Sequence, residues 1–226
     1  MTRGDPDCCS PPPDPRIARQ FDDKVAIWTD ADDFPDLVDV SGAILDLLRE
    51  ASLRRPSVLE LGCGTGGLSV ALLEMGAARV TGVDLSPSSV ALARRRAAAA
   101  GHADNASYEV GNAAEASTEQ HDWVVLDRII CCYGDVERLV GRAIELAGER
   151  VALSVPESRG WRGLVNRPLW LAEYAAWDRW RGGCRGYVHD LKRIERRLAA
   201  AGFVPTATDR VGLWHIGVYD RPGAVA

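Results

Sequence analysis

Five residues between positions 60 and 84 have the types and the spacing of a nucleotide-binding site. Gly62, Gly64 and Gly67 satisfy the pattern G-x-G-x-x-G, and Asp84 follows Gly64 by 20 residues. Glycines in this pattern let a ligand approach the backbone closely, and an acid about 20 residues later binds ribose hydroxyls. Glu60 stands two positions before the first glycine. The glycines alone fit two cofactors, a dinucleotide such as NAD and S-adenosylmethionine.

Glu60 favours the second of these cofactors. The residue stands near the carboxyl end of the first expected strand, where ligands of such sheets bind. A carboxylate there repels a pyrophosphate held on the helix N-terminus, because like charges a few ångströms apart in a partly dry site cost on the order of kilocalories. S-adenosylmethionine carries an ammonium and a sulfonium and has no phosphate. We therefore expect S-adenosylmethionine as the cofactor, with an NAD-dependent oxidoreductase as the alternative.

An alternation of strand and helix patterns must position these residues. Apolar runs predict five strands, at residues 56–62, 78–85, 107–113, 122–132 and 149–156. Helical patterns follow at residues 68–75, after Ser86 and after Asp135, and a capped helix after Asp190 precedes a hairpin over residues 204–220. The prediction is an α/β fold, a Rossmann-like, seven-stranded, mostly parallel sheet with a terminal antiparallel hairpin and helices on both faces.

Two segments resemble a known family. VLELGCGTGG (58–67) is similar to the first motif of the class I S-adenosylmethionine-dependent methyltransferases, and GVDLSPSSVALARRRA (82–97) to the segment after their second strand. The resemblance covers residues 56–156, and the strand order with its terminal hairpin extends it to the end of the chain. It implies that Gly62, Cys63 and Gly64 line the methionine part of the cofactor. It further implies that Asp84 binds both ribose hydroxyls and that Leu85 flanks the adenine.

The family's adenine contact departs from its usual form here. The family places an acid in a G-D-A-like turn after the third strand, and this chain has Gly111-Asn112-Ala113. The amide oxygen of Asn112 can still accept a hydrogen bond from the adenine amine, without charge assistance. The alternative is an ordinary turn asparagine. The resemblance also implies that Asp127, at the end of the fourth strand, lies near the methionine part.

A narrower likeness concerns three later segments. LDRIICCYGDVERLV, SVPES and GLWHIGVYDR are similar to bacterial methyltransferase-like proteins, some of them labelled as related to magnesium-protoporphyrin O-methyltransferases. This likeness points to methylation of a small molecule. We expect an aromatic or hydrophobic acceptor, methylated at oxygen, with nitrogen or carbon as alternatives.

The sulfonium is already a good leaving group, so the protein chiefly has to align the acceptor with the methyl group and exclude water. Arg128 and Tyr133 follow the fourth strand, close to where the methyl group would point. His189 is the candidate general base, because it precedes the last helix at the end of an insertion. The alternative for His189 is a structural histidine at a helix entry.

The insertion spans residues 157–189 and is the candidate substrate lid, because loops over a rigid sheet usually carry binding. Trp170, Tyr174 and Trp177 share one helical stripe, which fits core packing, a homodimer contact or an aromatic lid. Residues 159–193 hold seven arginines and one lysine against three acids, a charge of +5 in a chain of −5. This charge fits an acceptor with a carboxylate or phosphate, or a solvated basic face.

The rest of the chain sets the context. Residues 1–15 contain five prolines and predict a flexible leader before a single domain at 16–226, whose residues 16–55 form a helical cap with Phe21 and Trp28 on one stripe. The net charge of −5 argues against a nucleic-acid partner, including RNA, and no apolar run suggests a membrane. The six cysteines lack metal-site spacing, so we expect reduced thiols, no metal and a cytoplasmic protein. A cofactor-binding module without catalysis is a further alternative.

Overall fold

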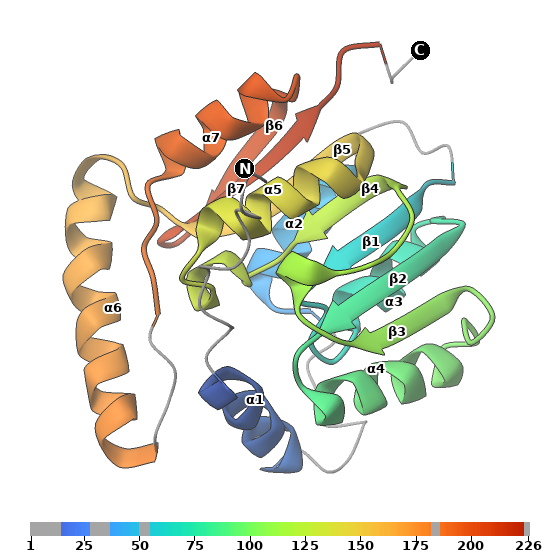
Figure 1. The fold of residues 1–226 in the computed structure, drawn as a ribbon, viewed down its shortest axis with the longest axis horizontal. Coiled ribbons are helices and arrows are strands. Elements are labelled where there is room, and N and C mark those ends of the chain that lie inside the picture. The colour runs from blue at the N-terminus through green and yellow to red at the C-terminus, as the bar shows by residue number, and fades with distance from the viewer. Residues whose placement is uncertain (1–14, 28–36, 50–54, 182–185, 224–226) are drawn as a thin grey trace, which may run out of the picture.

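A seven-stranded sheet forms the centre of the molecule (Figure 1). The computed structural model describes residues 15–27, 37–49, 55–181 and 186–223. The strands are β1 (Ser57–Leu61), β2 (Arg79–Asp84), β3 (Ala106–Val110), β4 (His121–Leu126), β5 (Ala147–Pro156), β6 (Val204–Val211) and β7 (Trp214–Asp220). Their order is β3-β2-β1-β4-β5-β7-β6, with β7 antiparallel to both β5 and β6 and the other pairs parallel. The predicted fold class is confirmed.

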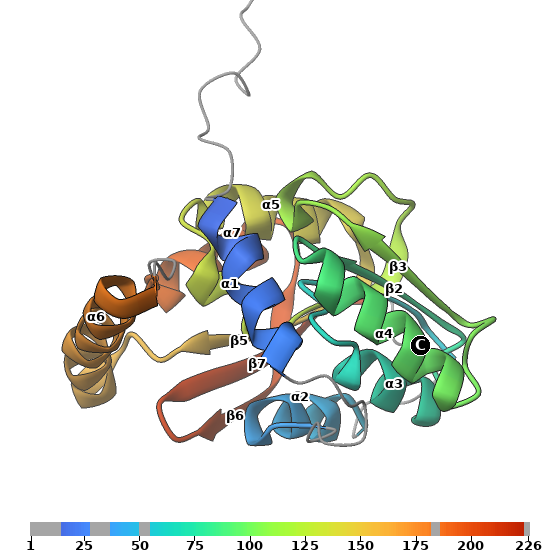
Figure 2. The same ribbon diagram turned by 90° about the horizontal axis from the view of Figure 1, so that it is seen from below.

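Helices cover both faces of this sheet (Figure 2). They are α1 (Pro15–Ile27), α2 (Asp39–Arg49), α3 (Gly67–Glu74), α4 (Pro87–Ala99), α5 (Val136–Leu146), α6 (Gly160–Arg181) and α7 (Leu191–Ala200), with 3-10 turns η3 (Ala113–Glu115) and η4 (Ile130–Cys132). The three expected N-caps are present. Ser86, Asp135 and Asp190 each accept a hydrogen bond from a backbone N–H in the first turn of the helix that follows.

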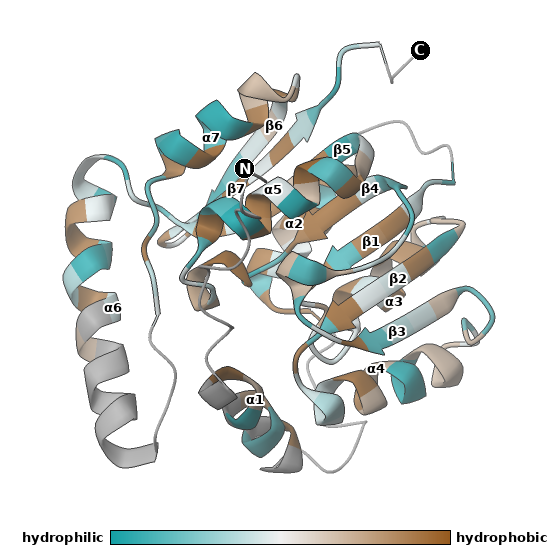
Figure 3. Ribbon diagram, viewed as in Figure 1, coloured by the Kyte–Doolittle hydropathy of each residue, from teal (hydrophilic) through white to brown (hydrophobic). Residues whose placement is uncertain are grey.

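Alternating residues of the central strands supply two separate cores. Leu59 and Leu61 of β1 face α5 and α7, whereas Val58 faces α2 and α3. The central strands are accordingly the most hydrophobic part of the ribbon in Figure 3. Such burial on both faces fixes the strand register, because a one-residue slip would exchange the two cores. Because β1 pairs in parallel with both β2 and β4, the carboxyl ends of these three strands meet at one edge of the sheet.

The fourth strand ends earlier than its apolar sequence predicts. The run at 122–132 suggests a strand to Cys132, but β4 ends at Leu126 and η4 follows. Arg128 adopts a left-handed backbone conformation with φ of +53°, which a strand cannot contain. The buried Asp127 carboxylate directs this turn through the hydrogen bonds described below. Tertiary contacts therefore override the local β-propensity of Ile129, Ile130 and the cysteines.

The insertion contains a 22-residue helix, which begins ten residues before the stripe of Trp170, Tyr174 and Trp177. α6 continues through Pro168, which removes only one backbone donor from the helix. Its first half is attached to the sheet by Asn166, whose Nδ2 donates to the carbonyl oxygens of Glu157 and Leu213, both at 2.8 Å. Trp170 also packs edge-on against Trp214, with ring centroids 5.6 Å apart. These contacts orient α6 where the sequence pattern does not.

Several features expected from the sequence lie outside the described residues or side chains. Most of the expected leader and Trp28 fall in the undescribed segments, as do Cys8, Cys9 and Cys184. The side chains of Tyr174 and Trp177 are also outside the described part, although the backbone of α6 continues through them.

α1 and the anchored half of α6 flank the carboxyl edge of the sheet in Figures 1 and 2. No helix among the described residues is long and apolar enough to cross a membrane.

Candidate active site

The glycine loop between β1 and α3 depends on backbone conformations that other residues rarely adopt. Gly62 and Gly64 have φ of +78° and +50°. A Cβ atom on Gly62 would lie 2.6 Å from Ile129 Cδ1, so a side chain there would collide with the segment after β4. The N–H groups of Gly62 and Cys63 donate to the carbonyl oxygen of Val83, at 2.7 and 3.1 Å. The loop is thereby joined to the ends of both β2 and β4.

The Asp84 carboxylate is held by two backbone N–H groups. Its Oδ2 accepts from Gly64 N and its Oδ1 from Ser86 N, both at 2.9 Å. Burial raises the pKa of Asp84, and the hydrogen bonds from Ser86 and Gly64 oppose that rise. Each carboxylate oxygen retains a second acceptor site, so the pair can receive two hydroxyls of a ribose. Leu85, half-buried, follows immediately after the strand.

Asn112 presents a donor where the sequence suggested an acceptor. Its Oδ1 caps η3 by accepting from Ala114 N at 3.1 Å, which fixes which end of the amide is oxygen. Its Nδ2 is buried and has no acceptor in good hydrogen-bond geometry among the described residues. Ala113 beside it is 3% exposed, and the Tyr133 hydroxyl lies near the amide. A ring nitrogen of adenine is an acceptor of the kind that this donor requires.

Glu60 is buried near the glycine loop, and this burial weakens the expectation that its charge repels a pyrophosphate. The side chain is 2% exposed and accepts a hydrogen bond from Ser69 Oγ of α3. Burial raises its pKa to about 8, against the effect of the Ser69 hydrogen bond, and the charges of Asp127 and Asp84 add to the rise. Glu60 is therefore mostly protonated at neutral pH in the ligand-free protein. A cationic ligand would favour its ionised form, whereas a pyrophosphate would meet little repulsion from it.

Cys63 contributes its backbone to the loop and its side chain to the core. The side chain is 5% exposed and packs with Val90, Ala93 and Tyr108 against α4. Burial raises the pKa of the Cys63 thiol, so this thiol is a small apolar group and not a nucleophile.

Asp127 is the most constrained carboxylate at the edge. Its side chain is 6% exposed, and both of its oxygens accept serine hydroxyls. Ser41 Oγ of α2 donates to Oδ2 at 2.5 Å, and Ser154 Oγ of β5 donates to Oδ1 at 2.6 Å. Ser154 Oγ in turn accepts from Arg128 N at 2.8 Å. Helix α2 and strands β4 and β5 are thus joined at one carboxylate.

The guanidinium of Arg128 lies beside Asp127 and is open to solvent. Arg128 Nε lies 3.6 Å from Asp127 Oδ2, and the arginine side chain is 46% exposed. A positive φ at a non-glycine residue costs of order 1–2 kcal/mol and marks many functional turns. An anionic and a cationic side chain therefore adjoin at the end of β4, next to the glycine loop.

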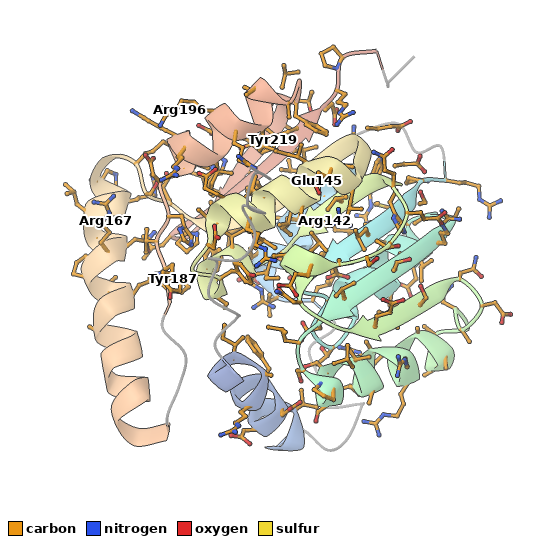
Figure 4. The ribbon with its side chains drawn as sticks, viewed as in Figure 1. Arg142, Glu145, Arg167, Tyr187, Arg196 and Tyr219 are labelled. Carbon is orange, nitrogen blue, oxygen red and sulfur yellow. The ribbon has the colours of Figure 1, made fainter. Side chains whose placement is uncertain are left out.

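The remaining two catalytic candidates lie around η4. His189 Nε2 lies 2.8 Å from the carbonyl oxygen of Tyr133, so Nε2 carries the hydrogen of the neutral ring and Nδ1 holds the lone pair. Burial lowers the pKa of His189, opposed by the carbonyl groups of Tyr133 and Ile130. The Tyr187 ring stacks on His189 with centroids 5.4 Å apart, and Tyr187 N donates to Cys131 O at 2.8 Å. Figure 4 shows Tyr187 between α6 and the sheet.

Tyr133 follows η4, which separates it in the chain from Arg128. Its side chain is 6% exposed and belongs to the core beneath α5, with Ala113 and Val136. Burial raises the pKa of its hydroxyl, and the amide of the nearby Asn112 side chain partly lowers it. The structure thus brings Tyr133 together with Asn112, on the side of β3.

Sequence reasoning missed four residues that hold this edge together. Ser41 and Ser154 donate hydrogen bonds to Asp127, and Tyr187 stacks on His189. Asp22 of α1 accepts hydrogen bonds from Ser86 Oγ at 2.6 Å and from the backbone N–H of Ser88 at 3.0 Å. These serines and this aspartate match no motif and lie 27 to 86 residues from their partners. Only the position of Ser154, facing inward at the carboxyl end of an expected strand, offered a signal.

Comparison with known proteins finds a family match within the chain and two curated relatives. Residues 58–146 match the family described as "Methyltransferase domain". The chain is 29% identical over 168 residues to the chloroplastic magnesium protoporphyrin IX methyltransferase of Arabidopsis thaliana, covering 73% of this chain and 51% of that protein. A second curated relative, the ribosomal protein L11 methyltransferase of Aeromonas hydrophila, is 40% identical over 60 residues, 26% of this chain and 20% of that protein. The chain therefore spans about half the length of the first relative and a fifth of the second.

Solved structures show the same fold. Magnesium protoporphyrin IX methyltransferase from Synechocystis PCC 6803, with bound S-adenosylhomocysteine (SAH), superposes with a TM-score of 0.69 at 19% identity, covering 92% of this chain and 100% of that one. An O-methyltransferase family protein from Burkholderia thailandensis gives 0.66 at 16% identity, covering 80% and 56%. With the glycine loop, Asp84 and the sheet order, the family match decides between the two cofactors in favour of S-adenosylmethionine. The chain therefore has the fold of the methyltransferases with which it superposes, and its residues 58–146 match a methyltransferase domain.

Proposed function

We propose that this protein transfers the methyl group of S-adenosylmethionine to an oxygen atom of a small aromatic or hydrophobic molecule. The observation that carries the proposal is the arrangement at the carboxyl edge. The glycine loop after β1 and Asp84 at the end of β2 adjoin the charged pair Asp127 and Arg128, which directly follows β4. His189 Nε2 is hydrogen-bonded to the carbonyl oxygen of Tyr133 in the next turn. Structural neighbours include a geranyl diphosphate methyltransferase and PhzM, a pyocyanin biosynthetic protein.

The residues of the chain fit the cofactor at three points. Asp84 would bind the ribose hydroxyls, the buried Nδ2 of Asn112 would donate to the adenine ring, and the glycine loop would follow the methionine part. Leu85 and Ala113 would flank the adenine. Asp127 and Arg128 have the charges that complement the ammonium and carboxylate of the methionine part. Bound S-adenosylmethionine would supply an electrophilic methyl group with a built-in leaving group.

The acceptor would enter from the side of η4 and α6. His189 would take the acceptor's proton at Nδ1, because its Nε2 hydrogen is committed to the Tyr133 carbonyl and the lowered pKa keeps the ring neutral at pH 7. Tyr133 would retain its proton and support Asn112. The first half of α6, anchored through Asn166 and Trp170, would form one wall of the acceptor space and exclude water.

Two measurements test this function in sequence. Calorimetric titration should show binding of S-adenosylhomocysteine at micromolar strength or better and no binding of NADH. The protein is then incubated with methyl-labelled S-adenosylmethionine and fractions of a metabolite extract. Label should enter a small molecule that partitions into organic solvent, and mass spectrometry of the product should place the methyl group on oxygen.

Other outcomes identify the rival functions. Tight binding of S-adenosylhomocysteine without label in any fraction would indicate a cofactor-binding module without catalysis. Label that appears in RNA, with binding that weakens steeply with salt, would indicate a nucleic-acid methylase. Label on nitrogen or carbon would retain the small-molecule acceptor and replace O-methylation.

A further inference from the structure

Helix α2 is fixed to the sheet on its apolar face and reaches the active edge through one polar residue. Ile44 and Leu48 are fully buried in the core that α2 shares with α3 and the sheet. Ser41 lies in the first turn of α2, is 4% exposed, and donates its hydroxyl to Asp127 Oδ2 at 2.5 Å across 86 residues of sequence. The position of this hydroxyl is therefore set by the packing of the whole helix.

The hydroxyl binds the same carboxylate oxygen that faces Arg128. Arg128 Nε lies 3.6 Å from Asp127 Oδ2, within ion-pair distance but longer than a hydrogen bond, so the two charges adjoin without a direct hydrogen bond. The other oxygen, Oδ1, is held by Ser154, which also accepts from Arg128 N. Both carboxylate oxygens are thus satisfied by neutral donors, and the guanidinium, 46% exposed, is not needed to satisfy them.

We infer that Ser41 is a positioning residue for the methionine end of the cofactor, because its hydroxyl occupies Asp127 Oδ2 and keeps that oxygen from forming a direct hydrogen bond with the Arg128 guanidinium. Without the hydroxyl, the nearest strong donor for Oδ2 is Arg128, and a charge-assisted hydrogen bond between them would neutralise both. With the hydroxyl in place, Asp127 and Arg128 remain able to bind an ammonium and a carboxylate. The inference rests on the proposed function, in which these two residues contact the methionine part.

The test compares two ligands that differ only at that end. S-adenosylhomocysteine carries the amino-acid part, and 5′-methylthioadenosine has the same adenosine with a methyl group in its place. For Ser41→Ala we expect S-adenosylhomocysteine to bind about tenfold more weakly by calorimetry, an ordinary loss for one hydrogen bond to a charged group. Binding of 5′-methylthioadenosine should change less than about twofold, because its contacts lie at β2 and β3.

A matched control exists at the opposite edge of the sheet. Ser57 Oγ donates to Asp122 Oδ2 at 2.8 Å and accepts from Asp122 N at 3.0 Å at the amino ends of β1 and β4, so Ser57→Ala removes a serine–carboxylate hydrogen bond and one further bond far from the ligand. It should leave the affinity for both ligands unchanged. Ser41→Thr and Ser41→Val form a second pair with nearly equal shape and helix propensity. Threonine should restore binding of S-adenosylhomocysteine, and valine should not, even if the alanine variant fails to fold.

Each outcome bears on a distinct claim. Unchanged affinity for S-adenosylhomocysteine in Ser41→Ala and Ser41→Val would overturn the inference while the proposed function stands. Equal weakening of both ligands would show that Ser41 only supports the fold, which also overturns it. Failure of the wild-type protein to bind S-adenosylhomocysteine would overturn the proposed function and, with it, the role of Ser41.

Discussion

Asp84 on β2 accepts a hydrogen bond from the backbone N–H of Gly64 at 2.9 Å, so the predicted ribose-binding acid also fixes the glycine loop. We expect Asp84→Asn to weaken binding of S-adenosylhomocysteine by about 1–3 kcal/mol, because it removes charge-assisted hydrogen bonds and places an amide NH₂ against an N–H group. Calorimetric titration measures the change. Asp122→Asn, at the other end of the sheet, is the control, and equal affinities of the Asp84 variant and the wild type would remove Asp84 from the site.

His189 offers a prediction about turnover. Its Nε2 donates to the Tyr133 carbonyl, so His189→Gln can keep this hydrogen bond through its amide while it loses the basic nitrogen. We expect the variant to bind S-adenosylhomocysteine normally and to turn over roughly 10²- to 10⁴-fold more slowly, the usual contribution of a general base. The wild-type rate should fall as pH drops below the lowered pKa of His189. Normal turnover by the variant across this pH range would return His189 to a structural role.

Glu60 predicts opposite effects on stability and on binding. Its pKa of about 8 in the fold, against 4.5 in the unfolded chain, means that the folded state binds more protons between these values. Stability of the ligand-free protein therefore decreases as pH rises from about 4.5 to 8. Glu60→Gln should remove this part of the decrease and raise the free energy of unfolding at pH 8 by roughly 4 kcal/mol.

The same substitution should reduce affinity for the cationic cofactor. In the wild type, binding of S-adenosylmethionine should strengthen as pH rises toward 8 and release protons, because a nearby cation favours the ionised carboxylate. Calorimetry in two buffers of different ionisation enthalpy measures the released protons. Identical proton release by wild type and Glu60→Gln would show that Glu60 does not sense the ligand.

His215 on β7 should make the fold sensitive to acid. The ring is 2% exposed, and burial together with the charge of Arg159 lowers its pKa to about 4 from 6.5. The unfolded chain then binds more protons between these values, so this contribution is present above pH 6.5 and is lost as pH falls toward 4. We expect a loss of about 3 kcal/mol over that window.

The share of the acid-induced loss of stability that comes from His215 can be measured by comparing the wild type with His215→Gln. Urea denaturation of both proteins at several pH values between 7 and 4 gives the difference in free energy of unfolding. The difference between them should shrink as the wild type loses its share at low pH. Parallel curves for the two proteins would mean that His215 does not titrate over this range.

Much of the cofactor half could be predicted because its signals are local. The glycine loop, Ser86 as a helix cap and Asp84 at a strand end all lie within one β-α-β unit, where strand direction fixes which end faces the ligand. Apolar runs predicted every strand of the sheet. The end of β4 was the exception, because Asp127 binds partners from α2 and β5 that no local pattern shows.

The sequence by itself therefore predicted the fold, indicated the cofactor through its family-like motifs, and pointed to the edge of the sheet that carries the candidate site. Tertiary structure alone decided the state of the charged groups there. Burial raises the pKa of Glu60, and the cap on η3 turns the Asn112 amide so that its NH₂ group can donate to a ligand. Ser41 donates to the Asp127 oxygen that lies near Arg128. Each of these states depends on desolvation or on a hydrogen bond that the fold positions. The spacing of neighbouring residues predicts neither the desolvation nor the hydrogen bond.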